Sequence, residues 1–198
     1  MYHQPVLLKE SLDGLNINPE GVYVDATFGG GGHAKKILEQ LNNGTLIAFD
    51  QDKEAEENIL ADSRLVFIRH NFRYMKNFLK YMNYTQINGI FADLGVSSHH
   101  LNSPERGFSF RFDAQLDMRM NQNSRLTAKQ IINTFSDKKL YQILKEYGEL
   151  NKPGKIVNAI IRAREEKEIT TTYQLVNTLT PYFPERFRNK MLAKIFQA

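Results

Sequence analysis

Cysteine is absent from this sequence of 198 residues, and so is any long hydrophobic run. Without cysteine there is no disulfide framework, no thiolate zinc site and no cysteine nucleophile, which suits a reducing compartment. No apolar run approaches the ~20 residues that a membrane-spanning helix needs. The first residues also lack the basic and then apolar pattern of a secretory signal. We therefore expect a cytoplasmic protein that has no membrane partner.

The overall composition excludes few further classes of protein. Hydrophobic residues make up 41% and charged residues 24%, which are ordinary values for a soluble globular protein. The formal net charge is +4 and the isoelectric point is near 9.2. A mild positive excess favours contact with polyanions, but many soluble proteins share it. Nucleic-acid binding is therefore compatible with the composition without being established by it.

The first hundred residues alternate between β-rich runs and helical spacing. The predicted strands are residues 21–26, 45–50, 65–68 and 87–93, and the predicted helices are residues 33–41, 53–60 and 74–82. The second of these strands is nearly all apolar, as expected when helices cover both faces of a parallel sheet. This alternation predicts an α/β fold with a doubly wound parallel sheet.

The pattern changes after about residue 105, and residues 126–198 show helical periodicity with Asp137 and Thr172 as predicted caps. We expect a first domain over 1–107, an all-helical insertion over 108–190, and a return toward the first domain over 191–198. Four parallel strands followed by helices leave an exposed hydrophobic sheet edge, which natural domains cover or pair. The sequence also stops in mid-helix. These features predict a C-terminally truncated chain whose missing part returns to the sheet.

A glycine cluster, Gly29–Gly32, follows the first predicted strand and its last acid, Asp25. Glycine lets the backbone turn sharply and approach a ligand without interference from a Cβ atom. Asp50 ends the next predicted strand, at a distance along the chain that suits a carboxylate accepting hydrogen bonds from both ribose hydroxyls. A tight strand-to-helix turn with a capping Asp is the purely structural alternative. The combination of loop and acids favours a nucleotide-binding site.

The same loop fits a dinucleotide fingerprint, because Gly29, Gly31 and Ala34 satisfy G-x-G-x-x-A. An NAD(P)-dependent oxidoreductase is therefore the rival hypothesis. Asp25 argues against it, because a pyrophosphate gains nothing from a carboxylate beside the glycines. The ammonium group of a methionine moiety, by contrast, would be attracted to that acid.

Asp93 follows the fourth predicted strand, at the end where ligands bind in open α/β folds. An acid there can accept an N–H of an exocyclic amine, whose lone pair is delocalised into its ring and is a poor nucleophile. It can equally bind a cofactor, and a turn cap is the structural alternative. The residues alone leave these three roles open.

Three longer stretches carry a family resemblance: residues 3–10 (HQPVLLKE), residues 25–33 (DATFGGGGH), and residues 93–120, which include DLGVSS, ERGFSF and LDMRM. Weaker matches are Tyr147-Gly148-Glu149 and Phe196-Gln197-Ala198. In these stretches the sequence resembles the MraW/RsmH family of small-subunit rRNA (cytosine-N4) methyltransferases, and the resemblance covers essentially the whole chain.

The resemblance implies a Rossmann-like, S-adenosylmethionine-dependent methyltransferase with an inserted all-helical domain. Its implied substrate is a cytidine in the decoding region of 16S rRNA of the small ribosomal subunit, methylated at N4, and a homodimer is left open. The implied cofactor-binding residues are Gly30, Gly31, Gly32, His33, Asp50, Phe72, Asp93 and His100. The family usually has Gln where this chain has His100, and Asp93 is also the implied catalytic residue. A non-catalytic RNA-binding protein is a third hypothesis.

The segment after Asp93 contains two further patterns. His99 and His100 are adjacent in a strand-end loop and point in different directions, so no metal site is expected. Three arginines and three phenylalanines then interleave: Arg106, Phe108, Phe110, Arg111, Phe112 and Arg119. Such residues can clamp an RNA backbone and stack on bases, or the rings can anchor the helices. We expect the phenylalanines mostly in the core and the arginines facing the cleft.

Overall fold

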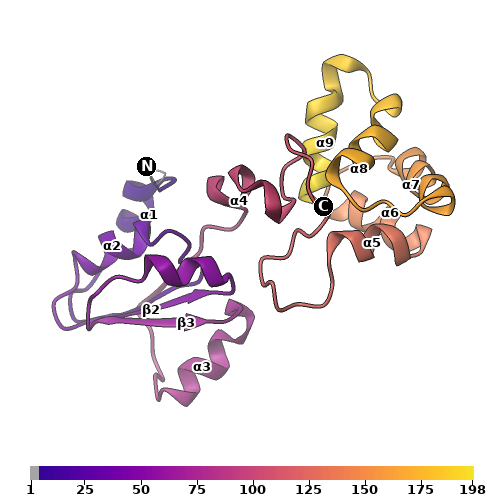
Figure 1. Ribbon diagram of the computed structural model, residues 1–198. Coiled ribbons are helices and arrows are strands. Elements are labelled where there is room, and N and C mark those ends of the chain that lie inside the picture. The colour runs from indigo at the N-terminus through magenta and orange to yellow at the C-terminus, as the bar shows by residue number, and fades with distance from the viewer. Residues whose placement is uncertain (1–4) are drawn as a thin grey trace. The chain divides into compact units, whose positions relative to one another are not determined.

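The computed structural model describes residues 5–198, which form two compact units (Figure 1). Within the described residues, the first unit comprises 5–95 and 120–122, and the second comprises 96–119 and 123–198. His3, in the first resembling stretch, lies outside the described residues. The division falls after Gly95, whereas the sequence predicts a domain limit at residue 107. The domain limits of the sequence analysis stay a prediction.

The first unit is built on a four-stranded sheet in the order β3-β2-β1-β4. Its strands are β1 (Val22–Asp25), β2 (Thr45–Asp50), β3 (Leu65–Arg69) and β4 (Gly89–Phe91). Every neighbouring pair is parallel, which confirms the predicted α/β sheet. The order reverses between β1 and β4, and such a switch point is where open α/β sheets bind ligands.

Helices cover both faces of this sheet, with α1 (Leu8–Leu15) and α2 (Gly32–Leu38) on one face and α3 (Met75–Tyr81) on the other (Figure 1). Successive strand residues point to opposite faces. Tyr23 therefore packs in the cluster that contains α2, and Val24 packs in the cluster that contains α3. These two small cores fix the ends of the strands relative to one another.

Two local elements differ from the sequence prediction. Helix α1 was not predicted, and its Leu12 and Leu15 pack on the core cluster of the α2 face. The helix predicted over 53–60 is instead a short 3₁₀ helix, η1 (Lys53–Asn58), capped by the Asp52 carboxylate. Ala55 is the only buried residue of η1, so this segment has no apolar stripe to support a longer α-helix.

The second unit is helical. Its elements are α4 (Ser98–Asn102), η3 (Pro104–Arg106), α5 (Ala128–Thr134), α6 (Asp137–Glu146), α7 (Gly154–Glu166), α8 (Thr172–Leu179), η4 (Thr180–Tyr182), η5 (Glu185–Phe187) and α9 (Arg188–Gln197). The caps of α6 and α8 lie one residue before the predicted ones, at Ser136 and Thr171. Leu140, Ile160 and Leu179 belong to one apolar cluster of this unit. None of the described helices is long and apolar enough to cross a membrane.

The interleaved arginines and phenylalanines have separate roles in the second unit. Phe110 packs on the apolar cluster and meets Phe196 edge to face, as predicted for a core ring. Arg106, however, was expected to face a cleft and is buried, donating from Nη2 to the Arg119 carbonyl at 2.9 Å. Arg111 is exposed, and its guanidinium lies over the Phe112 ring.

Candidate functional site

Three acids lie at the carboxyl ends of the central strands in the first unit. Asp25 ends β1 and Asp50 ends β2, while Asp93 follows β4 by two residues. The register pairs Asp25 with Phe91 on one side and with Ala48 on the other. Because parallel strands end at the same edge of a sheet, these acids share the edge at which the strand order reverses.

The glycine loop is held against this edge by hydrogen bonds to the end of β2 and from η1. Gly29 N–H donates to Asp50 Oδ2 at 2.8 Å, and Asn58 Nδ2 donates to the Gly29 carbonyl at 3.1 Å. Phe28 N–H donates to the Phe49 carbonyl, and this bond extends the pairing of β1 with β2 into the residues that follow β1. The loop is therefore fixed to Asp50 directly.

The loop needs glycine at two positions for different reasons. Gly31 has a φ of 73°, and a Cβ atom there would lie 3.1 Å from Cζ of Phe28. At Gly32, a Cβ atom would lie only 2.5 Å from Cγ of Pro5. Left-handed backbone and close approach both exclude larger residues. Gly30, between Gly29 and Gly31, is exposed and carries its backbone toward solvent.

Asp50 retains acceptor capacity after fixing the loop. Its Oδ2 accepts from Gly29 N–H, and its Oδ1 accepts from Asp52 N–H at 2.9 Å. An ionised carboxylate has about four acceptor positions, so roughly two are left for a ligand. Two adjacent hydroxyl groups are the ligand group that matches such a partly used carboxylate.

Asp25 is fully buried at the end of β1. Its Oδ1 accepts from Thr27 N–H at 2.9 Å, whereas its Oδ2 has no hydrogen-bond partner among the described residues. The pKa of this carboxyl is raised from 3.8 to about 7, because burial, the largest cause, and repulsion by Asp50 and Asp93 outweigh the lowering by the Thr27 hydrogen bond. A donor group of a bound ligand can satisfy such a buried acceptor.

Thr27 links two of the acids, a role the sequence analysis did not assign. Its N–H donates to Asp25, and its Oγ1 accepts from Asp93 N–H at 2.7 Å. The Asp93 backbone is therefore anchored at the sheet edge while its side chain stays exposed. The only signal in the sequence is a hydroxyl residue two positions after a strand-end Asp, which is typical of an Asx turn.

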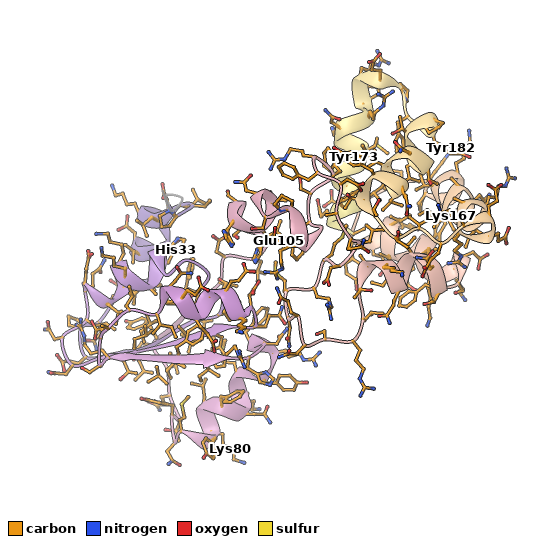
Figure 2. All side chains as sticks on the ribbon, in the orientation of Figure 1. His33, Lys80, Glu105, Lys167, Tyr173 and Tyr182 are labelled. Carbon is orange, nitrogen blue, oxygen red and sulfur yellow. The ribbon has the colours of Figure 1, made fainter. Side chains whose placement is uncertain are left out.

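His33 occupies the first turn of α2, and Figure 2 labels it on the opposite face of the sheet from Lys80 of α3. Its Nε2 lies 3.0 Å from the Val6 carbonyl, and a carbonyl can only accept, so Nε2 carries the proton. The imidazole ring also packs on Phe91, at a centroid distance of 4.3 Å. His33 thereby ties residues 5–6 and the end of β4 to the glycine loop.

Phe72 begins η2 (Phe72–Tyr74), three residues after β3 ends at Arg69, which pairs with Asp50 in register. Asn71 holds this segment, because its Nδ2 donates to Gln51 Oε1 at 3.0 Å. The Phe72 ring is 40% exposed. The structure thus brings the segment of Phe72 to the strand end that carries Asp50.

His100 belongs to the second unit, in helix α4. Its Nδ1 lies 3.0 Å from Ser97 Oγ, and its N–H donates to the same oxygen, forming a capping box at the start of α4. The ring also packs near Phe108. These contacts give His100 a local role within α4, and its predicted role toward a cofactor stays a prediction.

Comparison with known proteins identifies the relatives of this chain. Three relatives carry the name "Ribosomal RNA small subunit methyltransferase H". They come from Phocaeicola vulgatus (51% identical), Bacteroides thetaiotaomicron (52%) and Flavobacterium johnsoniae (50%). Each match covers 100% of this chain and only 65–66% of the relative. The chain thus spans just under two thirds of the length of these relatives. A model of the MraW methylase family matches residues 1–198, and the chain belongs to that family.

Proposed function

We propose that this chain binds S-adenosylmethionine and takes part in methylating N4 of a cytidine in the decoding region of 16S rRNA. Membership of a methylase family and relatives named for small-subunit rRNA methylation support the reaction class. Family membership also removes the reason to prefer an oxidoreductase, although the loop fits a dinucleotide fingerprint. The exact nucleotide and its N4 position rest on the family resemblance.

The observation that carries the proposal is the pairing of a bare glycine loop with Asp50. Gly29 N–H is bonded to Asp50, so the loop and the acid form one rigid edge. A Cβ atom at Gly31 would crowd the Phe28 ring in left-handed backbone, and Asp25 holds a buried oxygen without a donor among the described residues. A nucleoside that carries a positively charged amino-acid tail fits these features. The residues present therefore suit S-adenosylmethionine.

Each site residue has a proposed binding role. The free acceptor positions of Asp50 would receive the two ribose hydroxyls. Phe72, exposed beside the β3 end, would pack on the adenine ring. The backbone of Gly30–Gly32 would line the amino-acid part, and His33 would keep residues 5–6 over the loop through its bond to Val6.

The chemistry requires an amine and an electrophile held in line. S-adenosylmethionine supplies an electrophilic methyl group on its sulfonium when bound. Asp93, with its backbone fixed to Thr27 and its carboxylate exposed, would accept one N–H of the cytosine amine and make its lone pair available. Catalysis would then rest mainly on positioning.

RNA recognition is assigned to the helical unit. Arg111 is exposed above the Phe112 ring, and the Tyr173 hydroxyl donates to the Arg111 carbonyl at 3.1 Å. Tyr173, labelled in Figure 2, is itself 44% exposed. Guanidinium groups and aromatic faces side by side are suited to single-stranded RNA. A homodimer stays a prediction.

Mass spectrometry of rRNA nucleosides from a deletion strain tests the function. N4-methylcytidine should disappear, and the gene should restore it, whereas variants Asp50→Ala and Asp93→Asn should not. Asp62→Asn is the matched control, because Asp62 forms a half-buried ion pair with Arg64 and lies outside the site. Unchanged N4-methylcytidine in the deletion strain would refute the proposal.

A further inference from the structure

Asp25 is the one site residue whose charge state must change if a cation is to bind. The Oδ2 atom of Asp25 is buried, and no described residue offers it a donor. An ionised carboxylate in this position would be destabilised by desolvation. A proton on the carboxyl removes that penalty while no ligand is present.

The groups around Asp25 favour that proton. Asp50 at the β2 end and Asp93 beyond β4 are both acids, and both raise the Asp25 pKa. Thr27 contributes only a neutral N–H. From α2, the titratable His33 packs on Phe91, the register neighbour of Asp25, and is bonded to Val6. With its pKa near 7, Asp25 holds a proton in weakly acidic solution.

We propose that S-adenosylmethionine binding displaces the proton of Asp25, and that the freed carboxylate pairs with the ammonium group of the methionine moiety. This inference rests on the proposed function. Before binding, Asp25 is a neutral acid and the ligand carries its ammonium. Afterwards the carboxylate and ammonium form a hydrogen-bonded ion pair, and one proton has passed to the solvent.

The ammonium, not the sulfonium, is the expected partner. A sulfonium has no N–H and cannot satisfy a bare oxygen, whereas an ammonium has three donors. Charge-assisted hydrogen bonds of this kind are the strong ones. Because the acid must lose a proton, the affinity should fall about tenfold for each pH unit below about 7.

Isothermal titration calorimetry of the protein in buffers of different ionisation enthalpy measures the released protons. The titrations are run at or below about pH 7, where most of the free ligand's own amino group, with a pKa of about 7.7–8.0, stays protonated. S-adenosylmethionine should release about one proton at about pH 5.5 and about half a proton at about pH 7. S-adenosylhomocysteine, which keeps the ammonium but lacks the sulfonium, should release the same number. Methylthioadenosine, which lacks the amino-acid part, should release none.

The variant Asp25→Asn provides the second arm. Asn is a neutral isostere that keeps an oxygen for the Thr27 N–H, so folding should survive. The variant should bind S-adenosylmethionine about tenfold or more weakly at pH 7 and release no proton. Asp62→Asn should behave like the wild type.

The outcomes separate the two proposals. Binding without proton release, or equal release by Asp25→Asn, overturns this inference and leaves the proposed function standing. Release with S-adenosylmethionine but not with S-adenosylhomocysteine overturns the assignment to the ammonium. If the wild-type protein binds none of these adenosine ligands, the proposed function fails, and the inference fails with it.

Discussion

Asp25 in the first unit and Thr172 in the second are both fully buried polar residues, but they differ in whether their side-chain oxygens have hydrogen-bond partners. Thr172 Oγ1 donates to the Phe112 carbonyl at 2.6 Å and accepts from Ala114 N–H at 3.0 Å. Asp25 has one oxygen bonded and the other without a partner among the described residues. The Thr172 hydroxyl thus links two segments of the second unit by hydrogen bonds, whereas Asp25 has a carboxylate oxygen that can still accept a hydrogen bond.

This difference in hydrogen bonding has different consequences for the stability of the free protein. A satisfied buried hydroxyl stabilises, because folding replaces its hydrogen bonds to water. An unsatisfied acid weakens the free protein and is useful only when a donor arrives. The sheet edge therefore keeps a buried acceptor available, as the proposed ligand site requires, whereas the buried hydroxyl of the helical unit contributes to stability.

The largest effect on stability is expected from Leu179→Ala in the helical unit. Leu179 is fully buried in the apolar cluster of that unit, so its truncation should lower the free energy of unfolding by about 2–5 kcal/mol. Calorimetric melting measures the loss. S-adenosylmethionine affinity, measured below the melting range, should not change, and a large loss of affinity would break the contrast between the units.

The next effect is the pH dependence that Asp25 imposes on the first unit. Asp25 has a pKa of about 7 in the folded protein and 3.8 as its model value, so the folded state binds more protons between these values. The free energy of unfolding should therefore fall as pH rises from about 4 to about 7, by on the order of 3 kcal/mol. Urea unfolding of the ligand-free protein at several pH values measures it. Asp25→Asn should flatten the profile, and an unchanged slope would contradict the burial of an ionisable acid.

A smaller effect comes from adding one methyl group at two glycines. Gly31→Ala places a Cβ in left-handed backbone beside Phe28 and should cost about 1–2 kcal/mol while weakening cofactor binding. Gly14→Ala is the matched control, because its Cβ would meet nothing within 4 Å in helix α1. It should stabilise by about 0.5–1 kcal/mol and leave binding unchanged. Equal effects of the two variants would remove the special role of the loop.

Sequence reasoning predicted the sheet well, because buried parallel strands leave apolar runs that end in recognisable acids. Residues 45–50 form the predicted strand, and β4 is shorter than predicted. Helix α1 was missed because its sequence, LKESLDGL, is short and contains Gly14, so tertiary packing of Leu12 and Leu15 decides its structure.

The chemistry of the site could be predicted only in part. Acids at strand ends are visible in the sequence, and Asp50 meets the glycine loop as the nucleotide-site hypothesis requires. The unpartnered Oδ2 of Asp25 and the hydrogen bonds that link Thr27 to Asp25 and Asp93 depend on the direction of side chains. The spacing of residues in the sequence does not reveal that direction. Arg106 illustrates the same limit, because the sequence could not tell a guanidinium that faces a ligand from one that binds a carbonyl.

Cofactor titration of the wild type and of Asp50→Ala tests the central claim most directly. The wild-type protein should bind S-adenosylmethionine more tightly than NAD⁺ or NADH. Asp50→Ala should lose affinity on the order of a hundredfold, since ribose contacts and the anchor of the glycine loop disappear together, and Asp62→Ala should bind normally. Wild-type affinity in Asp50→Ala, or tighter binding of a nicotinamide dinucleotide, would contradict the account.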